Sequence, residues 1–416
     1  MAPPPSTKWQ TDLPDHLLHQ MILPRVPFKC LLRYKCVSKE IYSLISTDAV
    51  FAANQSRSAN TSSSGFVYMT CSGLSFFPDP ELIGVPDPSL NFLNLTSPKV
   101  DLVSSTNGLL LLYGEFNGMK SHCVCNPATK EMAVVPNNVN VVGEEYYHTE
   151  MGFAYDPCEL PHRYTIVDPL LMYHSLNNVE FSNALHYQFN IFHSDTGKWT
   201  RSSQRVYLDI YPTLSKAVCA KGVLYWCCGQ EYLLWYDTKR DLAGSLMWPE
   251  MKSSRDEMFH VGVNAGEITC CHTWIHGIEM WTLTGGSRWD RIHATSWDGL
   301  LDKYDFGIDL NLARCRQYKK FVKRYFISPI GYDGQFLYIA ACQKDRYNKL
   351  SWLFSWETEP NEFQEKGLFN IEWDFLGGCF NSFFTYANSM AKVPQICVPK
   401  EIGFSRMRSL PLSVIF

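Results

Sequence analysis

The sequence predicts a small all-α unit of three helices at the N-terminus, followed by a large all-β domain that is a β-propeller. Helix signals are concentrated in residues 12–51 and are rare afterwards. A hairpin signal then returns along the rest of the chain, which is typical of tandem β units. Aromatic residues make up 14% of the chain, and these side chains pack well on a pleated sheet.

The first expected helix begins after Asp12, which can cap its free amide groups, and Pro14 suits an early helical position. Pro24 disfavours further helix and predicts an end near Leu23. Residues at helical spacing form one apolar face of this helix: Leu13, Leu17, Leu18, Met21 and Ile22.

A second helix is expected from Pro27, with an apolar stripe of Phe28, Leu31, Leu32 and Cys36. A third follows Ser38, a good N-cap residue, and Glu40 in its first turn favours the helix dipole. Its apolar side contains Ile41, Leu44 and Ile45. Thr47 and Asp48 predict one further turn through Val50 and Phe51.

A unit of about 40 residues buries too little surface to be stable alone. Its large apolar side chains are each worth about 1.5–3 kcal/mol when buried. They must therefore pack on the rest of this chain or on a separate protein.

The same residues resemble an F-box. The shared pattern, LP…L…IL.R.P.K.LLR.KCVSK….LI, covers most of residues 12–51. The resemblance implies a Skp-type adaptor as partner and, through it, the cullin and RING subunits of a ubiquitin ligase. One position departs from the family, which usually has Trp where this chain has Ile41. The residues implied as adaptor contacts are Leu13, Pro14, Leu17, Ile22, Leu23, Val26, Pro27, Leu31, Leu32, Cys36, Val37, Ser38, Leu44 and Ile45.

The β region repeats a polar residue, a glycine and alternating apolar positions, followed by a second strand and turn. The signal appears as NGLLLLY, KGVLYW, AGEITC and DGQFLYI, and the interval from Gly222 to Gly266 is 44 residues. Units of this length predict propeller blades, with a β-sandwich as the alternative. We expect residues 65–71 to pair with the C-terminal strand-like segment in one blade, which would remove exposed edges.

This region also resembles the plant F-box-associated family and its kelch-like relatives. STNGLLLL, NPATKE, GFAYDP, FNIFHSDTGKW, GVLYW and LLWYDTKRD carry the resemblance in order, best over residues 100–250. It implies a platform that captures the substrate of the ligase. The expected organisation is a disordered tail at 1–11, the F-box at 12–55, a linker at 56–64 and the propeller domain at 65–416.

The sequence offers little for other functions. A net charge of −4 argues against a nucleic-acid surface, and the basic run from Arg314 to Arg324 is expected to be a solvated face. No signal peptide or membrane span is expected, which predicts a cytoplasmic or nuclear location. Cys270, Cys271, His272 and His276 form the best metal-like cluster, but neighbours on a strand alternate between faces, so we expect neither metal nor cofactor.

Three functions remain open on the sequence alone. The leading hypothesis is a non-catalytic receptor that joins an unknown client protein to the adaptor. The second is an interaction scaffold with weak or no adaptor binding, favoured by Ile41. The third is a propeller enzyme, although no catalytic constellation is recognisable.

Overall fold

The computed structural model describes residues 14–60, 65–70, 73–77, 89–93, 95–138, 150–157, 159–173, 185–208, 214–228, 232–249, 258–304, 325–343, 351–369 and 383–397. The tail expected at residues 1–11, the Asp12 cap and the basic run of residues 314–324 lie outside these ranges. None of the helices in the described part is long and apolar enough to cross a membrane.

The N-terminal unit is helical, as predicted. It contains the π-helical turn η1 (Leu17–Ile22), the 3-10 turn η2 (Leu23–Arg25), and helices α1 (Phe28–Tyr34), α2 (Lys39–Thr47) and α3 (Ala49–Asn60). Pro27 immediately precedes α1, and the Ser38 side chain accepts a hydrogen bond from the Ile41 amide at 3.1 Å, which confirms the expected starts of the second and third helices.

Six antiparallel sheets follow within the described residues, five of four strands and one of three. We call the four-stranded sheets blades 1 to 5 in chain order. Blade 1 contains β3 (Leu95–Thr106), β4 (Leu109–Phe116), β5 (Met119–Asn126) and β6 (Glu131–Val135); blade 2 contains β7 (Gly152–Tyr155), β8 (Tyr164–Tyr173), β9 (Leu185–His193) and β10 (Lys198–Tyr207). Blade 3 contains β11 (Val218–Ala220), β12 (Val223–Cys228), β13 (Tyr232–Asp237) and β14 (Leu242–Met247).

Blade 4 contains β15 (Met258–Asn264), β16 (Glu267–Trp274), β17 (Gly277–Thr284) and β18 (Arg288–Ser296). The helix α5 (Asp298–Lys303) follows it, and blade 5 contains β19 (Tyr325–Tyr332), β20 (Phe336–Gln343), β21 (Ser351–Glu357) and β22 (Glu362–Phe369). The three-stranded closing blade has the order β2-β1-β23, from β1 (Gly65–Thr70), β2 (Gly73–Phe77) and β23 (Phe383–Tyr386). A short 3-10 turn η3 (Asn91–Leu93) precedes β3.

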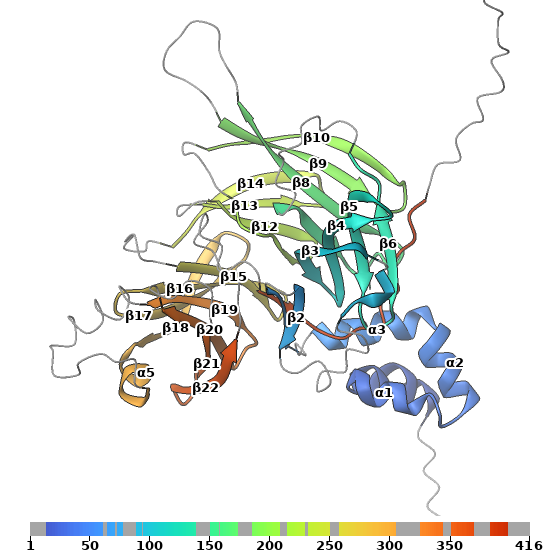
Figure 1. The fold of residues 1–416 in the computed structure, drawn as a ribbon, viewed down its shortest axis with the longest axis horizontal. Helices are drawn as coiled ribbons and strands as arrows, with labels where there is room; N and C mark the ends of the chain where they lie inside the picture. Colours follow the sequence, from blue (N-terminus) through green and yellow to red (C-terminus); the bar gives the residue numbers. More distant parts are fainter. Residues whose placement is uncertain are drawn as a thin grey trace, which may run out of the picture.

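The six sheets form a ring. The strands β3, β7, β11, β15, β19 and β23 each contact the next in that order, and β23 contacts β3, which completes the circle. β1 pairs with β23, with Val67 opposite Phe384, so the two ends of the β domain share one blade. The predicted propeller and its predicted closure are both confirmed. Figure 1 shows the blades together, with the helices packed beside blade 1 through α3.

Glycine turns set the hairpins that the sequence pattern indicates. Asn107-Gly108, Lys221-Gly222 and Ala265-Gly266 each have two successive positive φ angles, such as 50° and 79° at the first pair. Two residues with positive φ make the tight turn whose twist matches that of the strands. The interval from Gly222 to Gly266 therefore joins equivalent turns of blades 3 and 4.

The core of the β domain lies between neighbouring blades. Trp226 and Tyr236 of blade 3, for example, pack with Phe189 of blade 2, and all three side chains are buried. Aromatic side chains suit this role, since they fill wide gaps between twisted sheets.

Helix α3 extends past residue 55, where the sequence predicts the end of the F-box. Helix α3 continues to Asn60, so the segment expected as a linker at 56–64 begins as helix. Phe51, Gln55 and Ser56 are buried, which stabilises a helix whose sequence alone reads as small and polar. Residues 61–64 lie outside the described part.

Candidate functional site

The helical unit has a compact core that leaves other apolar side chains outside. Leu23, Phe28, Leu31, Ile45 and Phe51 form this core, with exposed fractions of 0–6%. Two residues of the β domain complete it, Ala128 and Met390. The unit is therefore packed against the propeller, as its small size requires.

A second set of apolar side chains on the helices faces solvent. Val37 is 70% exposed, Tyr42 56%, Met21 48% and Ile22 44%, and Leu17 and Tyr34 are exposed as well. Exposed apolar side chains that gather on one small unit are typical of a protein-interaction surface. We call these six residues the exposed helical patch.

The structure divides the fourteen sequence-predicted contact residues into groups. Those exposed to solvent are Pro14, Leu17, Ile22, Pro27, Cys36 and Val37; those half-buried are Val26, Leu32, Ser38 and Leu44. Leu23, Leu31 and Ile45 are interior, so they support the helices and cannot contact a partner without rearrangement. Leu13 lies outside the described residues.

The sequence-predicted set does not include Met21, Tyr34 and Tyr42, whose side chains the structure also exposes. Met21 belongs to the apolar face expected for the first helix, so periodicity alone could have included it. Tyr34 and Tyr42 carry no such signal, because an aromatic residue on a helix is as readily core as surface.

Helix α3 attaches the helical unit to one end of the propeller. The Ser56 hydroxyl donates a hydrogen bond to the carbonyl oxygen of Asn107 at 3.3 Å, in the β3–β4 turn. The Gln55 side-chain amide donates to the Asn388 carbonyl oxygen at 3.4 Å, and its oxygen accepts from the Met390 amide at 2.7 Å. We call this end of the ring the near end.

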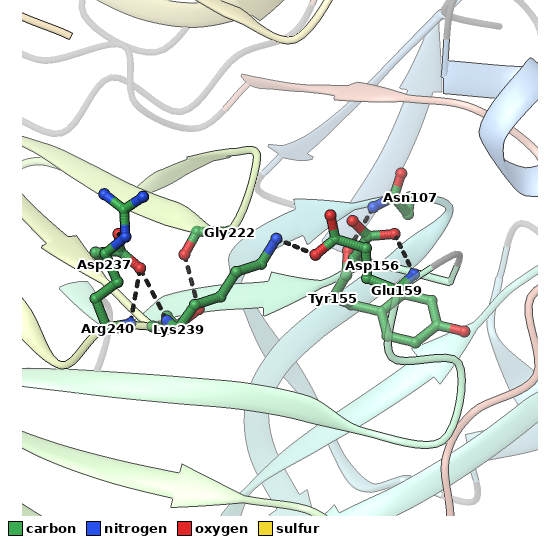
Figure 2. Close-up of polar contacts among 9 residues, drawn as sticks. Asn107, Tyr155, Asp156, Glu159, Gly222, Asp237, Lys239 and Arg240 are labelled. Carbon is green, nitrogen blue, oxygen red and sulfur yellow. Dashed lines mark hydrogen bonds and ion pairs between the residues drawn. The ribbon is translucent and has the colours of Figure 1, made fainter.

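Polar contacts join blades 1, 2 and 3 at the near end (Figure 2). The Asn107 side-chain amide donates to the Tyr155 carbonyl oxygen, and Lys239 of blade 3 pairs with Glu159 of blade 2. The Asp237 carboxylate accepts the Lys239 amide at 2.9 Å, which fixes that turn. These groups contact one another, so we interpret the network as a structural link between blades. We call it the bracing network.

The other end of the ring, which we call the far end, carries exposed apolar residues of its own. Antiparallel order places the β4–β5 turn and the C-terminal ends of β10 and β14 there, because the other ends of these strands lie at the near end. Met119, Tyr207 and Met247 occupy these positions and are 66%, 57% and 68% exposed. Three adjacent blades thus expose apolar side chains on the side away from the helices.

Two carboxyl groups of blade 2 lie close to one another. Burial raises the pKa of Glu150 to about 7, and the neighbouring Asp168 contributes in the same direction. Burial likewise raises the pKa of Asp168 to about 6, although a hydrogen bond from Asn190 opposes the shift. Burial shifts the pKa of both groups upward because a buried charge is poorly solvated.

The metal-like cluster does not converge. Cys270 packs between blades 3 and 4 with Ile268, whereas Cys271 lies in the separate core between blades 4 and 5. Burial raises the pKa of both thiols well above the usual range. Among the described residues no group of three histidine, cysteine or acidic side chains is placed to bind a metal ion.

The fold is therefore that of a six-bladed propeller with a small helical unit packed against one end. Residues 85–323 match the family described as the F-box associated beta propeller domain, which is more than half of the chain. The chain belongs to this family, as the sequence resemblance predicts.

Curated relatives from Arabidopsis thaliana agree. At2g16220, named as a candidate F-box protein, is 23% identical over 49% of this chain and 49% of its own length. At1g32420, named in the same way, is 23% identical over 64% of this chain and 84% of its own length. F-box protein At1g52495 is 21% identical over 65% of this chain and 66% of its own length. The chain thus spans about half of the first relative and about two thirds of the third.

Proposed function

We propose that the protein is the substrate-recognition subunit of an SCF-type E3 ubiquitin ligase. The observation that carries this proposal is the exposed helical patch, which stays uncovered although the helices are packed on the propeller. In F-box proteins this region binds a Skp-type adaptor, and the adaptor connects to the cullin and RING subunits.

The adaptor contacts on this proposal are the exposed members of the predicted set together with Met21, Tyr34 and Tyr42. Val37 is the strongest candidate, because it lies between α1 and α2 and is 70% exposed. Exposed lysine and arginine side chains belong to the same helical unit, including Lys29, Arg33 and Lys39. An apolar centre with a charged rim is the usual anatomy of a protein interface.

The client protein binds at the far end of the propeller. Met119, Tyr207 and Met247 give this surface apolar and aromatic anchors, the residue types that dominate binding energies. The near end is already engaged with α3 and with the bracing network of Figure 2. A client held here would lie near the transferring subunits, and the tether would raise the effective concentration of its lysines.

The chain itself takes no part in the chemistry on this proposal. Its family is that of F-box associated propeller domains, and its largest pKa shifts belong to buried thiols, tyrosines and carboxyl groups. We place the protein in the cytoplasm, the nucleus or both. Buried free thiols such as Cys123 and Cys125 are compatible with a reducing compartment.

Adaptor binding tests the proposal directly. The full-length protein is mixed with a purified Skp-type adaptor, and the dissociation constant is measured by calorimetry. Val37→Asp should weaken binding at least tenfold while the thermal midpoint stays unchanged, because the side chain is exposed. Met119→Asp, at the opposite end and similarly exposed, is the matched control. Wild-type affinity in Val37→Asp would remove the exposed helical patch as the docking site.

A second candidate function is an interaction scaffold that never enters a ligase. Ile41 favours it, because the family usually has Trp at this position. The measured dissociation constant separates the two functions, since a scaffold would bind the adaptor weakly or not at all.

A further inference from the structure

A residue from the C-terminal part of the chain, Met390, completes the core of the helical unit. Met390 is 7% exposed and packs in one cluster with Leu31, Ile45 and Phe51, which are 0–2% exposed. Without Met390 the helices would have a gap in their core. A gap of this kind leaves neighbouring side chains without packing partners and destabilises the unit.

Met390 belongs to a segment that is held from both sides. We call residues 387–393 the strap. On the helical side, Gln55 bonds to the strap backbone at Asn388 and Met390, with atoms 3.4 and 2.7 Å apart. On the propeller side, the Asn126 side-chain amide donates to the carbonyl oxygens of Ser389 and Ala391, at 3.0 and 2.6 Å.

The strap also packs closely against the β3–β4 turn of blade 1. The Ser389 hydroxyl donates to the Asn107 carbonyl oxygen at 2.8 Å, the same oxygen that accepts from Ser56 of α3. A Cβ atom on Gly108 would lie 2.4 Å from the Ser389 hydroxyl oxygen, so only glycine leaves room for the strap there. The Val393 amide donates to the Glu131 carboxylate at 2.8 Å and anchors its other end.

The position of the strap depends on ring closure. It follows β23 directly, and β23 is the strand that pairs with β1 to close the propeller. The strap can therefore reach Gln55 and Asn126 only after β23 has taken its place. Contacts between residues more than 330 positions apart form late, since a long loop must close first.

We propose that the strap makes adaptor docking conditional on a closed propeller: the helices present a stable docking surface only when residues 387–393 have filled their core. This inference rests on the proposed function and adds a form of control to it. A chain whose propeller is open or truncated would not be joined to the ligase through its helices.

Thermodynamic linkage gives a second consequence. If the seated strap favours adaptor binding, adaptor binding must stabilise the seated strap by the same factor. Backbone amides of residues 388–393 should therefore exchange hydrogen more slowly in the complex, although the exposed helical patch contains no strap residue.

The test uses the full-length chain with Met390→Asp, Met390→Ala as a milder variant, and Lys392→Asp as the control. Lys392 is an exposed residue of the same strap, so the control introduces the same aspartate at a position that lies outside the helical core. Hydrogen exchange is followed by mass spectrometry in α1, α2, α3 and the blades, and adaptor affinity is measured in parallel.

Met390→Asp should lower protection in the three helices at least tenfold and weaken adaptor binding at least tenfold, with the exchange of blades 2 to 5 unchanged. Met390→Ala should give smaller changes in the same direction, and Lys392→Asp should match the wild type. Wild-type helix protection in Met390→Asp and Met390→Ala would overturn the proposal, as would lost protection with undiminished adaptor affinity. If the wild type does not bind the adaptor, the proposed function fails, and the helix exchange then reports on the strap alone.

Discussion

Trp226 of blade 3 lies directly over the backbone of Gly152 in blade 2. A Cβ atom at Gly152 would come within 2.6 Å of the indole Cζ2 atom, a distance that real Cβ contacts do not show. The indole N–H donates to the carbonyl oxygen of Glu150 at 2.6 Å, and the Trp226 side chain is fully buried. Glycine at 152 thus sets how closely blades 2 and 3 approach.

Gly152→Ala should lower the free energy of unfolding by about 1–3 kcal/mol, the usual cost of overpacking a tight core. Urea denaturation followed by tryptophan fluorescence measures the change. Gly262→Ala on β15 is the matched control, because its Cβ atom would meet its nearest neighbour at an ordinary 3.5 Å. Equal stability of the two variants would show that the blades can separate without cost.

The sequence predicts the propeller well because the relevant signals are local. The hairpins depend on turns such as Asn107-Gly108, and the strands on alternating apolar residues beside them. The number of blades does not follow from such signals. It depends on contacts between strands far apart in sequence, such as β23 with β1 and β3.

The sequence predicts which residues of the candidate site are apolar but not which of them are exposed, because exposure depends on contacts between segments far apart in the chain. The F-box resemblance implies Leu31 and Val37 alike as adaptor contacts, yet Leu31 is fully buried and Val37 is 70% exposed. The difference arises from packing between α1, α2, α3 and the strap. Met390 illustrates the limit, since nothing near residue 390 in the sequence indicates that it completes the core of helices that begin near residue 17.

Ser38→Ala should loosen helix α2 without unfolding the propeller. The Ser38 hydroxyl oxygen accepts a hydrogen bond from the Ile41 amide, and loss of such a cap costs about 1 kcal/mol. Protection from hydrogen exchange over residues 39–47 should therefore fall roughly fivefold. Ser43→Ala, in the middle of the same helix, should leave this protection unchanged or raise it. A similar loss in both variants would mean that the cap has no special role.

Ile41→Trp tests whether the family departure matters. Ile41 is half-buried at the edge of the helical core, so a larger side chain would extend into the surface beside Tyr42. The added apolar area should strengthen adaptor binding by about 1 kcal/mol, or roughly fivefold. Calorimetry with the adaptor measures the change, and Ile292→Trp on β18 controls for non-specific association. Weaker binding by Ile41→Trp than by the wild type would show that isoleucine is required here.

Glu150 should make the protein less stable as the pH rises. Its pKa is about 7 in the folded protein, against 4.5 for an ordinary glutamate. Between these values the folded protein holds a proton that the unfolded chain releases. The stability associated with this proton is fully present below pH 4.5 and is lost as the pH rises through 7.

Glu150→Gln removes this titration while the hydrogen bond from Trp226 persists, because that bond is made to the backbone carbonyl oxygen of residue 150. At pH 8 the free energy of unfolding of the variant should exceed that of the wild type by on the order of 1–3 kcal/mol. This difference in unfolding free energy should shrink towards zero as the pH falls to 4.5. Burial lowers the pKa of His260 to about 4. The contribution of His260 to the stability of the protein is therefore lost as the pH falls, which is the opposite direction. It titrates equally in both proteins, so it cancels in their difference. Glu362→Gln, an exposed change on β22, should give a gap that does not vary in this way. A gap for Glu150→Gln that is constant between pH 5 and 8 would mean that Glu150 titrates as an ordinary carboxyl group.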